Sequence, residues 1–246
     1  MASFIERPLL LAPSAMRPQA AWETLAVRGI DRSPPATGHW LQLGLDVGVV
    51  PGLQVGIAGS EEVAPRATFD RIALRTVFGL HPDGALRFDA GNYRNDVSGS
   101  MNGSWALGIG APIRIVALSG KLAVFTGRTV ALPPIGGTLS VAFADDFLTV
   151  DLNHANVTAT IGVPVQVVVE PIPGLALALR SGYRHGWGGG NFSANWIPLG
   201  ADLMLNLASR VDLIATAEVP GETSTYGTFE SLTALFFVRT TIAVTF

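Results

Sequence analysis

The last sixteen residues alternate apolar and polar side chains with a period of two. Read back from the C-terminus, one face carries Phe246, Val244, Ile242, Thr240, Val238, Phe236 and Ala234. The other face carries Thr245, Ala243, Thr241, Arg239 and Phe237. Because successive side chains of a β-strand point to opposite faces, this pattern predicts a strand with one apolar face and one face that accepts an arginine. What the chain can fold into depends on whether other segments repeat the pattern.

The same alternation recurs along the whole chain. Besides the final strand, it predicts strands in residues 41–49, 53–57, 72–80, 86–90, 105–115, 157–167, 175–183, 197–207 and 211–219. Residues 20–29 form a candidate first strand, although Glu23 lies on the same face as Leu25 and Val27. Residues 121–153 are ambiguous and hold either one strand or three. The chain is therefore predicted to be all-β.

The hydropathy of the chain is too high for an ordinary soluble surface. Apolar residues make up 48% and charged residues 14% of the sequence, and the mean hydropathy is +0.39. No stretch approaches the roughly eighteen consecutive apolar residues that a transmembrane helix needs. Apolar residues that are dispersed by alternation instead are typical of a membrane-spanning β-barrel.

Short turns and longer polar connections follow each other along the sequence. The short turns lie at residues 51–52, 81–84, 171–174 and 208–210, whereas longer connections begin at Asp31, Glu61, Asn92, His185 and Pro220. Transmembrane barrels of bacteria have short periplasmic turns and long outer loops. The final strand would then run inward and leave Phe246 at the periplasmic edge.

A closed antiparallel up-and-down barrel satisfies every backbone hydrogen bond in lipid. With both chain ends periplasmic the number of strands is even, and the length favours twelve strands, with fourteen as the alternative. The soluble alternative is a periplasmic β-sandwich or a lipocalin-like barrel. Such a fold would carry more Lys, Glu and Asp on its polar face, whereas here this face is mostly Gly, Ala and Thr with scattered charges.

The terminal strand resembles the C-terminal signal strand of bacterial outer-membrane β-barrel proteins. In that family, a polar residue and a final aromatic residue are read by the assembly machinery. Arg239 matches the polar position, Phe246 matches the terminal aromatic, and Val244 stands where an aromatic is more common. With its Arg7-Pro8-Leu9 lead-in, the chain is similar to uncharacterised small transporter-like barrels of Gram-negative bacteria. The resemblance implies location in the outer membrane and insertion by the assembly machinery.

The domain organisation predicted from these features is simple. Residues 1–18 are expected to form an extended, proline-rich periplasmic lead-in, and residues 19–246 a single transmembrane barrel. The first residues lack a basic region followed by an apolar core, so we expect that a signal peptide has been removed. The net charge of −3 gives no reason to expect a nucleic-acid partner. The chain has no cysteine, which excludes thiol chemistry. The lipid bilayer is the expected partner.

Strand parity predicts which charged side chains line the barrel interior. The inward arginines are Arg71, Arg75, Arg87, Arg114, Arg180, Arg184 and Arg239, and the inward carboxylates are Asp46, Asp89, Asp202, Asp212 and Glu218. An open polar lumen of this kind would favour small anionic or zwitterionic solutes. Alternatively, opposite charges pair and fill a narrow interior.

Signals for chemistry are weak. The sequence has no G-x-S-x-G, no H-E-x-x-H, no phosphate-binding loop and no metal-ligand spacing, so we expect no catalytic residue, metal or cofactor. The leading hypothesis is a small passive porin-like channel for polar or anionic solutes. A second hypothesis is a closed structural or surface-binding barrel that acts through its outer loops. A third is a rim-site hydrolase of lipid or peptide, for which the candidate residues are His39, His154, His185, Asp31, Ser104 and Ser193.

Overall fold

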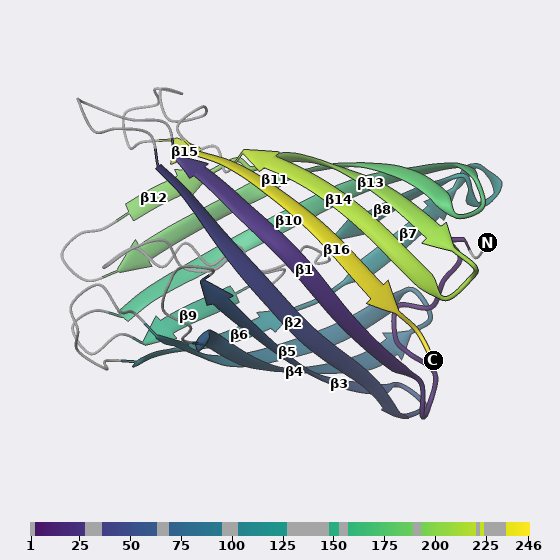
Figure 1. Ribbon diagram of the computed structural model, residues 1–246, viewed down its shortest axis with the longest axis horizontal. Helices are drawn as coiled ribbons and strands as arrows, with labels where there is room; N and C mark the ends of the chain where they lie inside the picture. Colours follow the sequence, from purple (N-terminus) through teal and green to yellow (C-terminus); the bar gives the residue numbers. More distant parts are fainter. Residues whose placement is uncertain are drawn as a thin grey trace.

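Hydrogen bonds between the first strand and the last strand close the sheet into a barrel (Figure 1). The computed structural model describes residues 3–27, 36–62, 69–94, 103–126, 148–152, 157–188, 193–219, 222–223 and 235–246. Both chain ends lie at the same end of the barrel. Within the described ranges, no helix is long and apolar enough to cross a membrane.

The strands follow each other around the wall in chain order. The first five are β1 (Met16–Val27), β2 (Ala36–Val50), β3 (Leu53–Glu62), β4 (Phe69–His81) and β5 (Gly84–Arg94). They are followed by β6 (Gly103–Gly110), β7 (Ile113–Ala117), β8 (Leu122–Thr126), β9 (Leu148–Leu152), β10 (Val157–Ile172) and β11 (Leu175–Gly188). The last are β12 (Ser193–Trp196), β13 (Leu199–Leu207), β14 (Val211–Val219), β15 (Glu222–Thr223) and β16 (Leu235–Val244).

Several of these short strands share one position in the wall. Strand β5 pairs with both β6 and β7, and β10 pairs with both β8 and β9. In the same way, β11 pairs with both β12 and β13, and these two pair in turn with β15 and β14. The result is a closed antiparallel barrel of twelve strands, which confirms the predicted fold class. Within the ambiguous residues 121–153, the described strands β8 and β9 share one wall position beside β10.

The short turns gather at the end of the barrel where the chain begins and ends. Gly52 and Gly174 adopt φ values of +80° and +84° in the β2–β3 and β10–β11 turns. This left-handed conformation is easy for glycine, which lacks a Cβ. The turn after Leu207 uses Ala208 and Ser209, with φ values of +52° and +63°. The turns predicted at residues 51–52, 81–84, 171–174 and 208–210 therefore connect consecutive strands.

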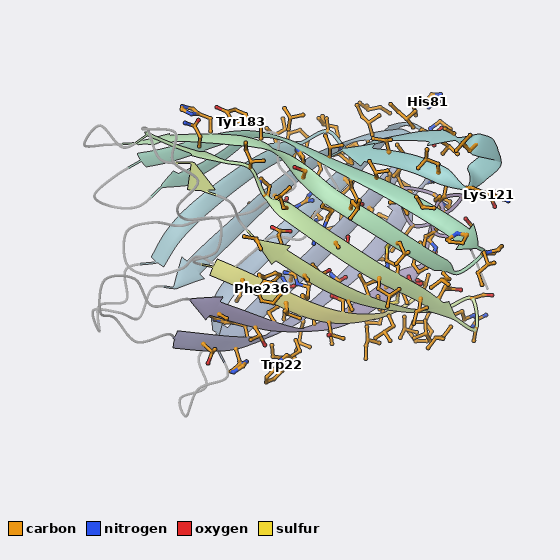
Figure 2. All side chains as sticks on the ribbon, turned by 90° about the horizontal axis from the view of Figure 1, so that it is seen from above. Trp22, His81, Lys121, Tyr183 and Phe236 are labelled. Carbon is orange, nitrogen blue, oxygen red and sulfur yellow. The ribbon has the colours of Figure 1, made fainter. Side chains whose placement is uncertain are left out.

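Side-chain exposure follows the predicted alternation. On β11, the outward Leu177 and Leu179 are 53% and 69% exposed, whereas Ala176 and Ala178 between and beside them are 0% and 2% exposed. Figure 2 shows Trp22, Tyr183 and Phe236 on the outside of the barrel. An apolar outer surface with polar groups inside is the reverse of a soluble protein. The outer face of this barrel is therefore suited to lipid.

Strand β1 differs from its prediction in its bounds and in the role of Glu23. The sequence predicts a strand in residues 20–29, but β1 covers Met16–Val27. Glu23 is completely buried and faces the interior, opposite the exposed Trp22. A charged side chain that faces lipid is costly, so burial of Glu23 in the interior agrees with its chemistry.

A buried ion pair joins β1 to β16. Glu23 and Arg239 lie directly opposite each other, bind through their side chains and are 0% and 2% exposed. A shift of the pairing by two residues would keep all outward side chains in lipid, because side-chain direction repeats every two residues. It would also place Glu23 opposite Phe237 or Thr241 and separate two buried charges. We conclude that this ion pair selects the register in which the barrel closes.

A second ion pair spans the same junction. Arg17 of β1 reaches over β16 to Asp212 of β14, with 3.0 Å between Nη2 and Oδ2. The small Ala243 lies directly opposite Asp212 on β16, and it leaves room for the arginine to cross. Two ion pairs thus support the register in which β1 pairs with β16.

We expect strong coupling between Glu23 and Arg239 in equilibrium unfolding in detergent or lipid. Glu23→Gln and Arg239→Gln should each lower the free energy of unfolding by about 3–5 kcal/mol, because each leaves a buried charge without its partner. The double variant should lose clearly less than the sum of the two. The more exposed pair Arg75–Asp89, within the β4–β5 hairpin, should show weaker coupling. Additive losses at Glu23 and Arg239 would contradict the assigned role.

Candidate functional site in the barrel interior

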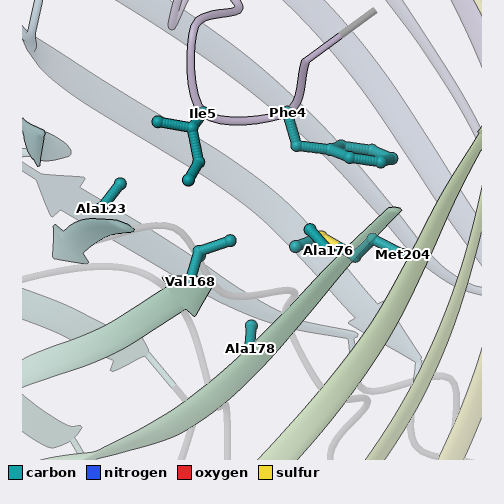
Figure 3. Packing of buried hydrophobic residues seen from close by; sticks show 7 residues of the cluster. All are labelled: Phe4, Ile5, Ala123, Val168, Ala176, Ala178 and Met204. Carbon is teal, nitrogen blue, oxygen red and sulfur yellow. The ribbon is translucent and has the colours of Figure 1, made fainter. Parts of the chain in front are cut away.

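The N-terminal segment, residues 3–15, enters the barrel at the end with the short turns. Phe4 and Ile5 are 7% and 0% exposed. They pack against inward side chains of four wall strands (Figure 3), namely Ala123, Val168, Ala176, Ala178 and Met204. Leu9 and Ile214 extend this apolar cluster. We call residues 3–15 the plug segment, because they occupy the mouth of the barrel.

Small residues of the wall make room for the plug segment. Three of the wall residues in the apolar cluster are alanines. Farther along the segment, a Cβ at Gly48 of β2 would lie 2.0 Å from the backbone oxygen of Ala12. The N–H of Ser14 donates to the carbonyl of Gly48 at 2.8 Å, and the N–H of Gly48 donates to the carbonyl of Ala15 at 2.9 Å. The wall and the segment are thus complementary in shape.

Glu170 of β10 holds the first residues of the plug segment. Its carboxylate accepts hydrogen bonds from the backbone N–H groups of Phe4 at 3.0 Å and Ile5 at 3.2 Å, and from the hydroxyl of Ser3 at 2.5 Å. It also accepts the N–H of Gly174 at 2.7 Å. The side chain is buried. These four donors satisfy a carboxylate that would otherwise be costly to enclose.

Arg114 of β7 binds carbonyl groups of the same segment. Its Nη1 donates to the carbonyl of Ile5 at 2.7 Å and to the carbonyl of Arg7. Its Nε donates to Asp83 Oδ1, in the β4–β5 turn, at 2.8 Å. The guanidinium is therefore a second anchor of the plug segment on the wall.

Two further contacts carry the plug segment across the mouth. The side chain of Arg7 binds Asp212 of β14. The N–H of Leu11 donates to Gln54 Oε1 of β3 at 3.0 Å. The plug segment also contacts β2, β7 and β10, so it is attached to the wall at several places.

A network of charged and polar side chains lies on the inner wall beyond the apolar cluster. Arg180 of β11 contacts Asp202 of β13 at 3.1 Å and Glu218 of β14 at 3.2 Å. Asp202 also accepts hydrogen bonds from Gln166 Nε2 at 2.8 Å and from Thr216 Oγ1 at 2.6 Å. The five side chains come from four neighbouring strands and are all buried. On this side, the interior is closely packed.

A second charged network lies on β4 and β5. Arg75 Nε donates to Asp89 Oδ1 at 3.1 Å, and Arg87 binds the other oxygen of the same carboxylate. The side chains of Arg75 and Asp89 are 29% and 15% exposed, more than the charged side chains of the first network. Two arginines share this carboxylate, and the carboxylate of Asp46 lies over Gly56, the residue that pairs with Arg75 on β3. This part of the inner face therefore carries charges of both signs.

Comparison with solved structures identifies the architecture. An outer membrane channel from Pseudomonas putida F1 matches with a TM-score of 0.55 and 14% identity, over 96% of this chain and 97% of the other. The translocator domain of the autotransporter NalP from Neisseria meningitidis matches with a TM-score of 0.54 and 10% identity, over 94% and 87%. The β domain of the Bordetella autotransporter BrkA matches at 0.53 and 12%, over 95% and 100%. The protein has the fold of a bacterial outer-membrane β-barrel.

These likenesses concern the fold of the outer-membrane barrel alone, since the sequence identities are low. No protein-family model matches the sequence, and no curated protein is similar to it. The side chains of the barrel interior are therefore the basis for a functional hypothesis.

The structure places most of the predicted interior residues of the outer-membrane barrel on its inner face. Buried there are Asp46, Arg87, Arg114, Arg180, Asp202, Asp212, Glu218 and Arg239, and partly buried are Arg75 and Asp89. The side chains of Arg71 and Arg184 lie outside the described ones. Phe246, part of the predicted assembly signal, exchanges backbone hydrogen bonds with Met16. The assembly role of Arg239, Val244 and Phe246 stays a prediction.

Sequence analysis missed four charged residues of the interior: Arg7, Arg17, Glu23 and Glu170. Among the described side chains, and apart from the turn residue Asp83, the interior then holds equal numbers of both signs. The seven arginines are Arg7, Arg17, Arg75, Arg87, Arg114, Arg180 and Arg239, and the seven carboxylates are Glu23, Asp46, Asp89, Glu170, Asp202, Asp212 and Glu218. The interior residues predicted from parity, seven arginines and five carboxylates, would give a net positive charge. The described part of the interior does not carry this excess.

Two of the three histidines proposed for a rim site, His39 and His185, lie on the outer surface. His39 stacks on Trp22, with 5.8 Å between ring centroids, and shares a hydrogen bond with Thr24 Oγ1 at 3.1 Å. His185 shares a hydrogen bond with Asn195 at 2.8 Å on β11 and β12. The structure does not bring these histidines together, because β2 and β11 are not neighbours. Asp31 and His154, and the side chains of Ser104 and Ser193, lie outside the described part. No cluster of metal-ligating side chains occurs among the described residues.

We expect Glu170→Gln to loosen the plug segment. The amide group turns one acceptor into a donor that faces the N–H groups of Phe4 and Ile5, so charge-assisted hydrogen bonds of about 1.5–3 kcal/mol are lost. Amide hydrogen exchange at residues 4 and 5 should then accelerate by roughly tenfold or more. The matched control is Glu6→Gln, an identical change on an exposed side chain of the same segment. Equal exchange rates in both variants would show that Glu170 does not hold the segment.

Proposed function

We propose that the protein is a small outer-membrane channel for small polar solutes whose periplasmic mouth is closed by the plug segment. One observation carries the proposal. The plug segment lies against the inner wall at the mouth, where hydrogen bonds and an ion pair hold it, and three of the wall residues in its apolar cluster are alanines. A wall that is narrow by itself would have no space for such a peptide.

The contacts of the plug segment are of a kind that water can replace. Because one partner is charged, each hydrogen bond to Glu170 or Arg114 contributes about 1.5–3 kcal/mol net after exchange with water. Release of the segment would leave a mouth lined by Ala123, Ala176 and Ala178. Beyond it, solutes would meet the charged side chains of Asp46, Arg75, Arg87 and Asp89. Because opposite charges balance over the described interior, we expect weak charge selectivity and passage of small polar solutes.

The proposed orientation follows from the asymmetry of the connections. The short turns and both chain ends lie at one end of the barrel (Figure 1), the end that faces the periplasm in bacterial outer-membrane barrels. The plug segment would then control access from the periplasmic side. The proposal does not include an enzyme, since His39 and His185 lie apart on the outer surface.

A closed scaffold that acts through its outer loops is the second candidate. It is favoured by the tight pairing of Arg180 with Asp202 and Glu218, and of Arg239 with Glu23, in the interior. If these networks never open, removal of the plug segment from the mouth would not create a path.

Planar-bilayer recording of the full chain separates the two candidates. The wild type should give rare, small conductance steps. The double variant Glu170→Gln, Arg114→Gln should give larger or longer steps, because the main chain of the plug segment loses its charged hydrogen-bond partners on the wall. The control Glu6→Gln should behave like the wild type. Heat-modifiable gel migration would establish that each variant is folded. Folded protein without any conductance, in the wild type and in the double variant alike, would refute the channel and favour the scaffold.

A further inference from the structure

The contacts in the mouth have the composition of a peptide-binding site. Glu170 accepts two consecutive backbone N–H groups of the plug segment and the hydroxyl of Ser3, while Arg114 donates to two of its carbonyls. These contacts bind main-chain atoms of a short segment that bends at residues 4–7. Main-chain hydrogen bonds of this kind do not depend on the identity of the side chains.

Side-chain selection comes from the apolar cluster. Phe4 and Ile5 insert next to each other among inward residues of β8, β10, β11 and β13 (Figure 3). Because three of these wall residues are alanines, the cavity shape is complementary to an aromatic residue followed by a branched aliphatic one. The hydroxyl of Ser3 adds a polar requirement immediately before them.

We infer that the periplasmic mouth is a binding site for short peptides that adopt the same bend, and that residues 3–7 are its tethered occupant. The ligand class is a short peptide with a small hydroxyl residue, an aromatic residue and a branched aliphatic residue in succession. Residues 8–15 act as the tether to β1. A short tether gives the occupant an effective concentration in the millimolar range, so a free peptide displaces it only when the occupant is weakened. Peptide recognition does not rest on the barrel being a channel.

The experiment weakens the occupant and leaves the wall intact. In the full chain, Phe4→Ser with Ile5→Ser removes both apolar side chains of residues 3–7. The probe is a fluorescent peptide with the sequence of residues 3–8, and its anisotropy is measured against increasing protein in detergent. A second probe carries serine in place of the phenylalanine and the isoleucine, with the same charge. Heat-modifiable migration checks that each variant is folded.

The first probe should bind the double variant saturably and at least tenfold more tightly than it binds the wild type, in which the site is occupied. Adding Glu170→Gln to the double variant should weaken binding tenfold or more, and the serine probe should not bind. The inference is overturned if the folded double variant fails to bind the first probe. It is equally overturned if both probes bind alike, or if Glu170→Gln has no effect, because binding would then be adsorption to the micelle or to another surface. Since anisotropy needs no conductance, peptide binding and channel function succeed or fail separately.

Discussion

The structure depends on the need of every backbone N–H and C=O group in lipid for a hydrogen-bond partner. An open sheet would expose two unpaired edges to hydrocarbon, and only closure removes them. Closure here rests on β1 and β16, which lie at opposite ends of the chain. Local sequence does not fix their register, because a shift by two residues preserves the lipid-facing pattern. The buried pair of Glu23 and Arg239 supplies the missing specificity. Buried ion pairs contribute little stability in general but can specify one arrangement among several.

Closure also creates an interior that must be filled or wetted. Inward charges would be costly if they were enclosed alone, and the barrel satisfies them in two ways. Away from the mouth, carboxylates and guanidinium groups of neighbouring strands bind each other, as Asp202 and Arg180 do. At the mouth, Glu170 and Arg114 also bind the main chain of the plug segment. The same demand for partners therefore produces both the networks of the wall and the attachment of the N-terminus.

Much of the fold could be predicted from the sequence, because the information is local. A period of two assigns each residue to the lipid or to the interior, and glycine-containing turns such as Pro51-Gly52 mark where strands end. The position of the plug segment could not be predicted in this way. Phe4 and Glu170 are 166 residues apart, and Arg7 and Asp212 are 205 residues apart. Parity gives the face of a side chain but not its partner across the barrel. Glu170 is also difficult to predict as an interior residue, because it lies next to a turn, where carboxylates are commonly exposed.

The placement of the plug segment inside the mouth is tested most directly by cross-linking. The chain has no cysteine, so two introduced thiols can react only with each other through a short bifunctional reagent. Cysteines at Phe4 and Met204, which share the apolar cluster, should cross-link efficiently in the folded protein and change its migration on a gel. Cysteines at Phe4 and Leu203 should not, because Leu203 is 43% exposed on the outer face. Efficient cross-linking to Leu203, or none to Met204, would contradict a plug segment inside the barrel.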